Sequence, residues 1–299
     1  MERTKLRHMT RKDAAFEIAL RAIGTIIFLV IAYPLYFVII ASISNPALVI
    51  NGGVWLWPRG LTFEGYRVLL DEGRIWVGYR NTVAYAVVGT AISMLVTVPA
   101  AYAVSRPDFK ARRPAMLFFL FTMYFSGGLI PTYLIITKTL RMDNSFWVMV
   151  IPFCLNVYNM IIVRSYFEHN LPRELWEAAQ LDGCSNTRYL LTVALPLSRA
   201  VVSVIMLYYV VAKWNEYFMA LIYIRNNELV PLQIVLRDIL IMNQILARSL
   251  TDAGSSEALT RANLIKYTSI IVGSAPMMML YPFLQKYFEK GIMIGAVKG

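Results

Sequence analysis

The chain has 299 residues, of which 58% are apolar and only 16% are charged, and its formal net charge is +11. A soluble domain has nearer a quarter of charged residues, so the composition excludes an ordinary soluble protein and indicates a polytopic helical membrane protein. The excess of Lys and Arg is typical of loops beside membrane helices, where it meets anionic lipid headgroups, and it does not predict a nucleic-acid partner.

Six runs of about 20 or more mostly apolar residues are long enough to cross a bilayer. They predict an all-α fold with transmembrane helices at residues 22–42, 82–105, 114–137, 146–166, 200–224 and 264–287. The first run is too long for a secretory signal and lacks a small-residue cleavage site, so we expect a retained helix. The weaker run at 229–246 contains Arg237 and Asp238 and predicts an amphipathic helix on the membrane surface, with a seventh span as the alternative.

Lys and Arg gather at both ends of the chain, between spans two and three, and on either side of the loop before span five. This distribution places both termini and that loop in the cytoplasm. We therefore expect a cytoplasmic N-terminal arm at 1–21, a transmembrane domain at 22–289 and a cytoplasmic tail at 290–299. Within the transmembrane domain, residues 168–198 form the cytoplasmic loop, and residues 225–263 form an extracytoplasmic loop with the interfacial helix.

The cytoplasmic loop has the pattern of two short helices joined by a glycine turn. Pro172 suits the first turn of a helix, and Glu177 lies early enough for the helix dipole to favour its charge. Gly183 follows the first helix, as glycine commonly does, and Ser185 or Asn186 can cap the second.

The first of these helices has a surface suited to contact with another protein. Ala178 and Ala179 give it little bulk, and the carboxylates of Glu177 and Asp182 can meet a basic partner. The alternative is an ordinary linker between two spans.

A sequence pattern distinguishes these two interpretations. It consists of Glu177, Ala178, Ala179, Asp182 and Gly183, followed by Leu195 and Pro196. It resembles the EAA loop by which ABC importer permeases contact their ATPases. Nearly the whole chain resembles the MalG-like permease subunits of carbohydrate ABC importers, which have the type I permease fold.

Further stretches carry the same resemblance. Arg80-Asn81-Thr82 opens span two, Trp214-Asn215-Glu216 lies in span five, and the tail from Lys290 to Gly299 matches the family's ending. Residues 125–133 and 231–233 resemble the LplC/YtcP-like branch, which is associated with complex oligosaccharides.

The resemblance implies a non-catalytic subunit that forms half of a pathway for a sugar or oligosaccharide. Its partners would be a second related permease, two ATPase subunits and an extracytoplasmic sugar-binding protein, in a bacterial cytoplasmic (inner) membrane. ATP and Mg²⁺ would bind to the ATPases, and this chain has no P-loop and would hold no cofactor. The tail residues that would reach the ATPase interface are Ala296, Val297, Lys298 and Gly299.

Polar and aromatic residues inside the predicted spans are candidates for the sugar pathway, because amides and aromatic rings suit sugar hydroxyls and C–H faces. They are Asn156, Tyr158, Asn159, Trp214 and Asn215. The alternative is hydrogen bonding between helices. Lys213 and Glu216 are three residues apart and can pair along one helix face, which favours a structural role. Gly89, Ala91 and Ser93 predict close packing of span two.

Two other classes of protein are alternatives. An ion-gradient-driven secondary transporter often has inverted repeats, and no matching halves are visible here. A membrane enzyme needs a cluster of reactive side chains, and His8 and His169 lack evident partners. Cys154 and Cys184 lie in different environments, so neither a disulfide nor a metal site is expected.

Overall fold

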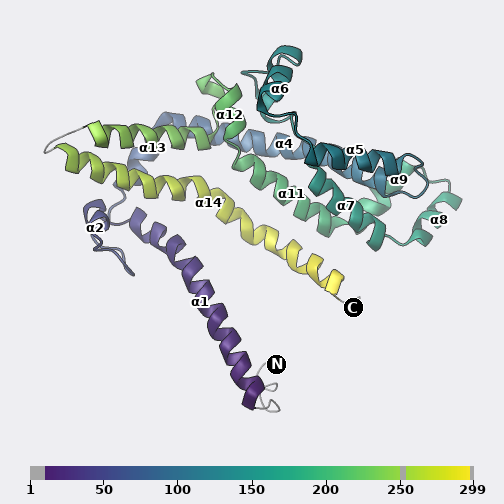
Figure 1. Ribbon diagram of the computed structural model, residues 1–299, viewed down its shortest axis with the longest axis horizontal. Helices are drawn as coiled ribbons and strands as arrows, with labels where there is room; N and C mark the ends of the chain where they lie inside the picture. Colours follow the sequence, from purple (N-terminus) through teal and green to yellow (C-terminus); the bar gives the residue numbers. More distant parts are fainter. Residues whose placement is uncertain (1–10, 250–253, 297–299) are drawn as a thin grey trace. The chain divides into compact units, whose positions relative to one another are not determined.

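The computed structural model describes residues 11–249 and 254–296, and every regular element in that part of the chain is a helix (Figure 1). The chain divides into two compact units. One contains Met1–Asp71 and Ile239–Gly273, and the other contains Glu72–Asp238 and Ser274–Gly299. The predicted all-helical class is confirmed for the described residues.

The first unit begins with the long helix α1 (Arg11–Ser42), whose apolar side chains are mostly exposed, as expected for a helix that faces lipid. The short helices α2 (Pro46–Ile50) and α3 (Glu64–Leu70) follow it. The C-terminal end of α1 packs into a small buried cluster of Ile40, Ala41, Val49 and Val54.

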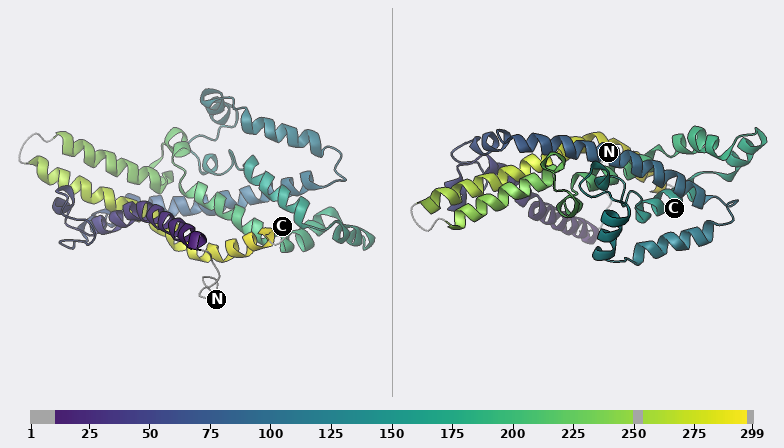
Figure 2. Two further views of the ribbon diagram at one scale, coloured as in Figure 1. Left: turned by 60° about the horizontal axis from the view of Figure 1, so that its bottom comes forward. Right: turned by 90° about the horizontal axis from the view of Figure 1, so that it is seen from above.

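The core of the second unit consists of three helices that lie against one another (Figure 2). Helix α4 (Gly73–Ser105) packs against α7 (Val157–Asn170) and α11 (Arg199–Trp214). The hydroxyl of Tyr209 on α11 links all three, because it lies 2.6 Å from Thr97 Oγ1 on α4 and accepts the Asn156 N–H at 3.0 Å. These bonds fix the register of α4, α7 and α11.

Small residues allow the close packing of α4 that the sequence predicts. Gly89 and Ser93 are buried, whereas Ala91 is exposed and takes no part in it. A Cβ atom at position 89 would lie only 3.1 Å from Cε of Lys213 on α11. The missing side chain of Gly89 therefore leaves the space along which the Lys213 stem runs.

The membrane-spanning segments are less regular than predicted. Within the described residues, two helices are long and apolar enough to cross a membrane alone, Ala15–Ser42 and Gly73–Ser105. Two further helix pairs reach such a length only across sharp bends. They are Arg112–Tyr124 with Leu129–Thr139, bent by 109°, and Asn186–Leu197 with Arg199–Trp214, bent by 88°. The arrangement of six spans remains a prediction.

Predicted span three, at 114–137, is one of these bent pairs. Helix α5 (Arg112–Tyr124) stops before α6 (Leu129–Leu134), and the π-helical segment η2 (Ile135–Thr139) continues from α6. Gly128 between α5 and α6 has a φ of +86°, a conformation that glycine adopts without strain.

The predictions of continuous helices for spans four and five were wrong. Residues 146–156 contain only the 3₁₀ turn η3 (Phe146–Met149), and α7 begins at Val157 because the Asn156 side chain caps it. Helix α11 ends at Trp214, and the chain breaks before α12 (Phe218–Tyr223), where Glu216 accepts the Met219 N–H at 3.1 Å. Polar side chains that cap new helices interrupt both apolar runs, and hydropathy does not detect this.

The end of the chain holds two long helices that follow the 3₁₀ turn η5 (Asn227–Leu229). Helix α13 (Leu232–Ser249) covers the run predicted to be amphipathic. Helix α14 (Gly254–Ala296) begins inside the predicted extracytoplasmic loop, before the expected start of span six at 264.

Hydrogen bonds hold the segment before α13 against the first turns of α4. The Asn81 side-chain amide donates to the carbonyls of Glu228 at 2.7 Å and Val230 at 3.0 Å. Thr82 Oγ1 accepts the Leu232 N–H at 2.8 Å. The Arg80-Asn81-Thr82 stretch therefore fixes residues 228–232, a structural reason for the pattern found in the sequence.

Candidate functional site

The two predicted helices between α7 and α11 are present, and the first of them is α8 (Arg173–Leu181). Pro172 takes the N-cap position, one residue before the predicted first turn, and Glu174 supplies a negative charge to that turn. No residue of α8 is fully buried. The helix thus exposes most of its surface.

The turn after α8 confirms the prediction that Gly183 follows the end of this helix. Its φ is +71°, and its N–H donates to the Gln180 carbonyl at 3.0 Å. The N–H of Cys184 donates to the Ala179 carbonyl at 2.9 Å. These two bonds form a Schellman motif, which satisfies the last carbonyls of a helix around one left-handed residue.

The second predicted helix is a series of three short segments. They are α9 (Asn186–Tyr189), the π-helical η4 (Leu190–Ala194) and α10 (Leu195–Leu197). Of the two predicted caps, the structure uses Ser185, whose Oγ accepts the Arg188 N–H at 3.3 Å. Tyr189, Leu190 and Ala194 are buried in the same apolar cluster as α4, α7 and α11.

A stack of side chains fastens α8 to the C-terminal end of α4. The guanidinium carbon of Arg106 lies 3.7 Å from the centre of the Trp176 ring, and an ion pair of 3.0 Å with Asp108 holds Arg106 there. The Trp176 ring meets Tyr189 edge to face, with their centres 4.9 Å apart. We call Arg106, Trp176 and Tyr189 the latch.

The latch is well placed to contribute energy. The Arg106 side chain is only 14% exposed. A cation over a tryptophan face stabilises by about 0.5–2 kcal/mol, and by more as it loses contact with water. Two helices that are far apart in the sequence are therefore joined by an interaction that depends on the orientation of α8.

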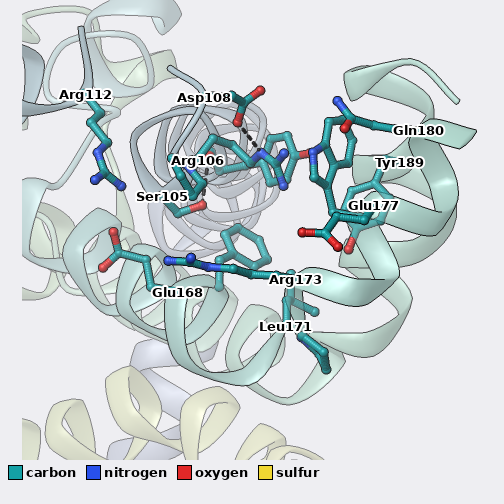
Figure 3. Close-up of a pocket in the computed structure, with 15 residues that line it drawn as sticks. Ser105, Arg106, Asp108, Arg112, Glu168, Leu171, Arg173, Glu177, Gln180 and Tyr189 are labelled. Atoms are coloured by element: carbon teal, nitrogen blue, oxygen red, sulfur yellow. Dashed lines mark hydrogen bonds and ion pairs between the residues drawn. The ribbon is translucent and has the colours of Figure 1, made fainter. Parts of the chain in front are cut away.

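A pocket of about 390 Å³ lies between the end of α4 and α8 (Figure 3). Both signs of charge line it, from Arg106, Asp108, Arg112, Glu168, Arg173 and Glu177. The Tyr102 hydroxyl is buried there, without a hydrogen-bond partner in the described structure. Burial raises the pKa of the Tyr189 phenol above its ordinary value.

The predicted loop residues face two directions. Glu177, Ala178, Asp182 and Pro196 are exposed, whereas Ala179 and Leu195 pack against the apolar cluster. Sequence reasoning missed Leu181, which is 90% exposed beside the turn. It also missed Trp176, although the tryptophan stands three residues before Ala179, on the same face of a helix.

The candidate pathway residues have several structural roles. The Asn156 side chain caps α7 by accepting the Asn159 N–H at 3.0 Å, and the Asn215 amide donates to the Val211 carbonyl at 2.9 Å. Asn159 and Trp214 are buried, and Tyr158 is exposed. A shared role in transport remains a prediction for these five residues.

Lys213 and Glu216 do not form the predicted pair along one helix face, because α11 ends between them. The Lys213 ammonium instead donates to the Met149 carbonyl at 2.9 Å, and Glu216 caps α12. These bonds support a structural role for Lys213 and Glu216.

Other sequence predictions concern cysteines, metal ions and the tail. Cys154 and Cys184 are both free. Among the described residues, no group of His, Cys, Asp and Glu side chains could hold a metal ion. Ala296 ends α14, whereas Val297, Lys298 and Gly299 lie outside the described residues, as do residues 1–10 of the predicted N-terminal arm.

Comparisons with known proteins place these features in context. Residues 75–294 match the family model described as binding-protein-dependent transport system inner membrane component. The chain is 33% identical to the polygalacturonan/rhamnogalacturonan transport system permease protein YtcP of Bacillus subtilis, covering 96% of this chain and 100% of that protein. It is also 33% identical to Protein LplC of the same organism, covering 98% of each.

A solved structure is similar along almost the whole chain. It is the crystal structure of a bacterial ABC transporter involved in the import of the acidic polysaccharide alginate. The match has a TM-score of 0.82 at 30% identity and covers 94% of this chain and 99% of that one.

Proposed function

Because the chain belongs to the family of binding-protein-dependent transport system inner membrane components, we propose that it forms half of an ATP-driven import pathway for a complex oligosaccharide. It is a transmembrane permease subunit of an ABC importer in the inner membrane. Two of the similar proteins are named for polymers, polygalacturonan or rhamnogalacturonan in one case and alginate in the other, which favours an oligosaccharide over a single sugar. Nothing in these comparisons supports the ion-gradient alternative.

The proposed machine consists of this chain, a second related permease, two ATPase subunits and an extracytoplasmic sugar-binding protein. ATP and Mg²⁺ bind to the ATPases. We assign six spans to the chain, with both termini and the loop at 168–198 in the cytoplasm. The proposed sugar pathway includes Asn156, Tyr158, Asn159, Trp214 and Asn215.

The latch is the observation that supports ATPase coupling through α8. A helix that transmits force has to be exposed to its partner and rigidly attached to the membrane core. The exposed Glu177, Ala178 and Asp182 meet the first requirement, and the stack of Trp176 under Arg106 meets the second. We assign to the ATPase contact Glu177, Ala178, Ala179, Asp182, Gly183, Leu195 and Pro196, with the tail residues 296–299 as a second contact.

Uptake by the reconstituted complex tests this function. The chain and its neighbouring gene products, placed in proteoliposomes with ATP inside and binding protein outside, should accumulate labelled pectin- or alginate-derived oligosaccharide. Liposomes with a non-hydrolysable ATP analogue serve as the control. Uptake driven by a proton or sodium gradient without ATP would contradict the proposal.

A further inference from the structure

A second groove lies on the side of α5 that meets α7, and six residues line it. They are Arg112, Arg113, Met116, Leu117, Arg164 and Glu168. Its volume is about 440 Å³. It shares Arg112 and Glu168 with the pocket beside α8, and Figure 3 shows both of these side chains on the same side of that pocket.

The charge in this groove is strongly positive. Glu168 is the single acid among the lining residues, and it is occupied by Arg164, whose Nη2 and Nε lie 2.8 Å and 3.1 Å from Oε1. Within the described part of the chain, Arg112 and Arg113 form no ion pair with an acidic side chain. The groove therefore presents two uncompensated guanidinium groups at the N-terminus of α5, where the helix dipole adds further positive potential.

An apolar surface continues from the charged end. Met116 and Leu117 form the next part of the groove. Leu117, Phe118 and Phe121 expose large apolar side chains along the first half of predicted span three. A ligand that matches this surface carries an anionic group at one end and a hydrocarbon chain at the other.

We propose that this groove binds an anionic phospholipid of the cytoplasmic leaflet, with its phosphate at Arg112 and Arg113 and an acyl chain along Leu117 and Phe121. Basic pockets between transmembrane helices on the cytoplasmic side bind such headgroups. The inference rests on the proposed orientation of the chain. It is independent of sugar transport, because lipid binding can be measured without ATP or substrate.

Native mass spectrometry of the purified complex provides the test, with phosphatidylglycerol and phosphatidylcholine of identical acyl chains added in competition. The wild-type chain should retain phosphatidylglycerol preferentially. The double variant Arg112→Gln/Arg113→Gln should lose this preference by about fivefold for each arginine removed. Arg112→Lys/Arg113→Lys, which keeps both charges, should retain most of it.

Arg188→Gln is the matched control, since it removes an exposed arginine of α9 that does not line the groove. Leu117→Asn should weaken retention while leaving both arginines intact. An unchanged melting temperature shows that a variant has folded.

Four results would overturn the proposal. Two are equal retention of the two lipids, and an equal loss in Arg188→Gln. The third is complete displacement of the lipid by inorganic phosphate, which would assign the groove to a free anion. The fourth is retention that appears only after the ATPase is removed, which would assign it to a protein partner.

Discussion

At Gly183 the backbone takes a left-handed conformation that ends α8, and apart from its two chain neighbours no residue has a heavy atom within 4 Å of the position where a Cβ would stand. A larger side chain would therefore meet no steric clash here. The limit on substitution is the φ of +71°, which residues other than glycine rarely adopt. A branched side chain strains such a turn by about 1 kcal/mol or more. Since α8 is attached elsewhere by the latch, we expect the strain to tilt the turn without unfolding the membrane core.

Gly183→Val should consequently assemble poorly with the ATPase, or assemble and fail to couple. The measurements are ATP-dependent uptake and the amount of ATPase retained on the purified permease. Gly183→Asn is the matched control, because asparagine tolerates a left-handed conformation. Glu177→Ala should act in the same direction more weakly. Wild-type transport by Gly183→Val with full ATPase retention would reduce the loop to a linker.

The cation over Trp176 predicts a second effect. Arg106→Gln removes the charge, and the rate of ATP hydrolysis stimulated by binding protein should fall about fivefold, the equivalent of about 1 kcal/mol. Trp176→Phe, which keeps a weaker aromatic face, should show a smaller loss. Arg173→Gln, in the same pocket but outside the latch, should leave stimulation nearly unchanged. An effect of Arg173→Gln as large as that of Arg106→Gln would exclude a specific role for the stack.

At the scale of elements, the first turns of α4 hold residues 228–232 through side-chain bonds to backbone. Asn81→Leu would leave the buried Val230 carbonyl without its side-chain donor and would remove one of two side-chain donors to the Glu228 carbonyl, at a cost of about 1–3 kcal/mol. We expect a lower melting temperature of the purified complex. Arg80→Gln removes an exposed ion pair with Glu228, an exposed hydrogen bond of 3.2 Å to the Glu228 carbonyl and a long one of 3.4 Å to Asn81 Oδ1, and should cost less than about 1 kcal/mol. Similar melting temperatures for the two variants would contradict this assignment.

The end of the chain gives a further element-scale prediction. Gly295–Gly299 is small and carries the charge of Lys298, which suits a narrow protein interface. Deletion of these five residues should reduce the stimulation of ATP hydrolysis by sugar-loaded binding protein while the subunit stays in the membrane. The control is an equally long deletion at the N-terminus, residues 2–6. Unchanged stimulation after the C-terminal deletion would show that the tail makes no functional contact.

Helix ends and caps could be predicted from the sequence, whereas contacts between residues far apart in the chain could not. The glycine end of α8 and the Ser185 cap depend on neighbouring residues, so their positions could be predicted. The breaks at Asn156 and Asn215 are not detected by hydropathy, because each lies within a run that is apolar on both sides. The contact of Arg106 with Trp176 could not be predicted from the sequence, because the two residues are seventy positions apart in the chain.

For the whole molecule, the lack of a P-loop and the exposed α8 predict dependence on partners. The chain purified from its native membrane should bring with it a related permease and two ATPase copies, as counted by native mass spectrometry. The chain expressed alone should be unstable or inactive, because surfaces made for partners remain exposed to lipid or water. A homo-oligomer that transports sugar without any ATPase would contradict this composition.

The contact between Gly89 and Lys213 has a consequence for how such chains diverge. A Cβ atom at position 89 would lie 3.1 Å from Cε and 3.2 Å from Cδ of the lysine, so a side chain there requires the lysine stem to shift. Substitutions at the two positions should therefore be epistatic, with the order of mutation deciding which lineages survive. A shorter side chain at position 213 would first make room for alanine or serine at position 89. In the reverse order, the variant with alanine or serine at 89 and lysine at 213 would be overpacked. Aligned descendants should show covariation at these two sites, although they are 124 positions apart in the chain.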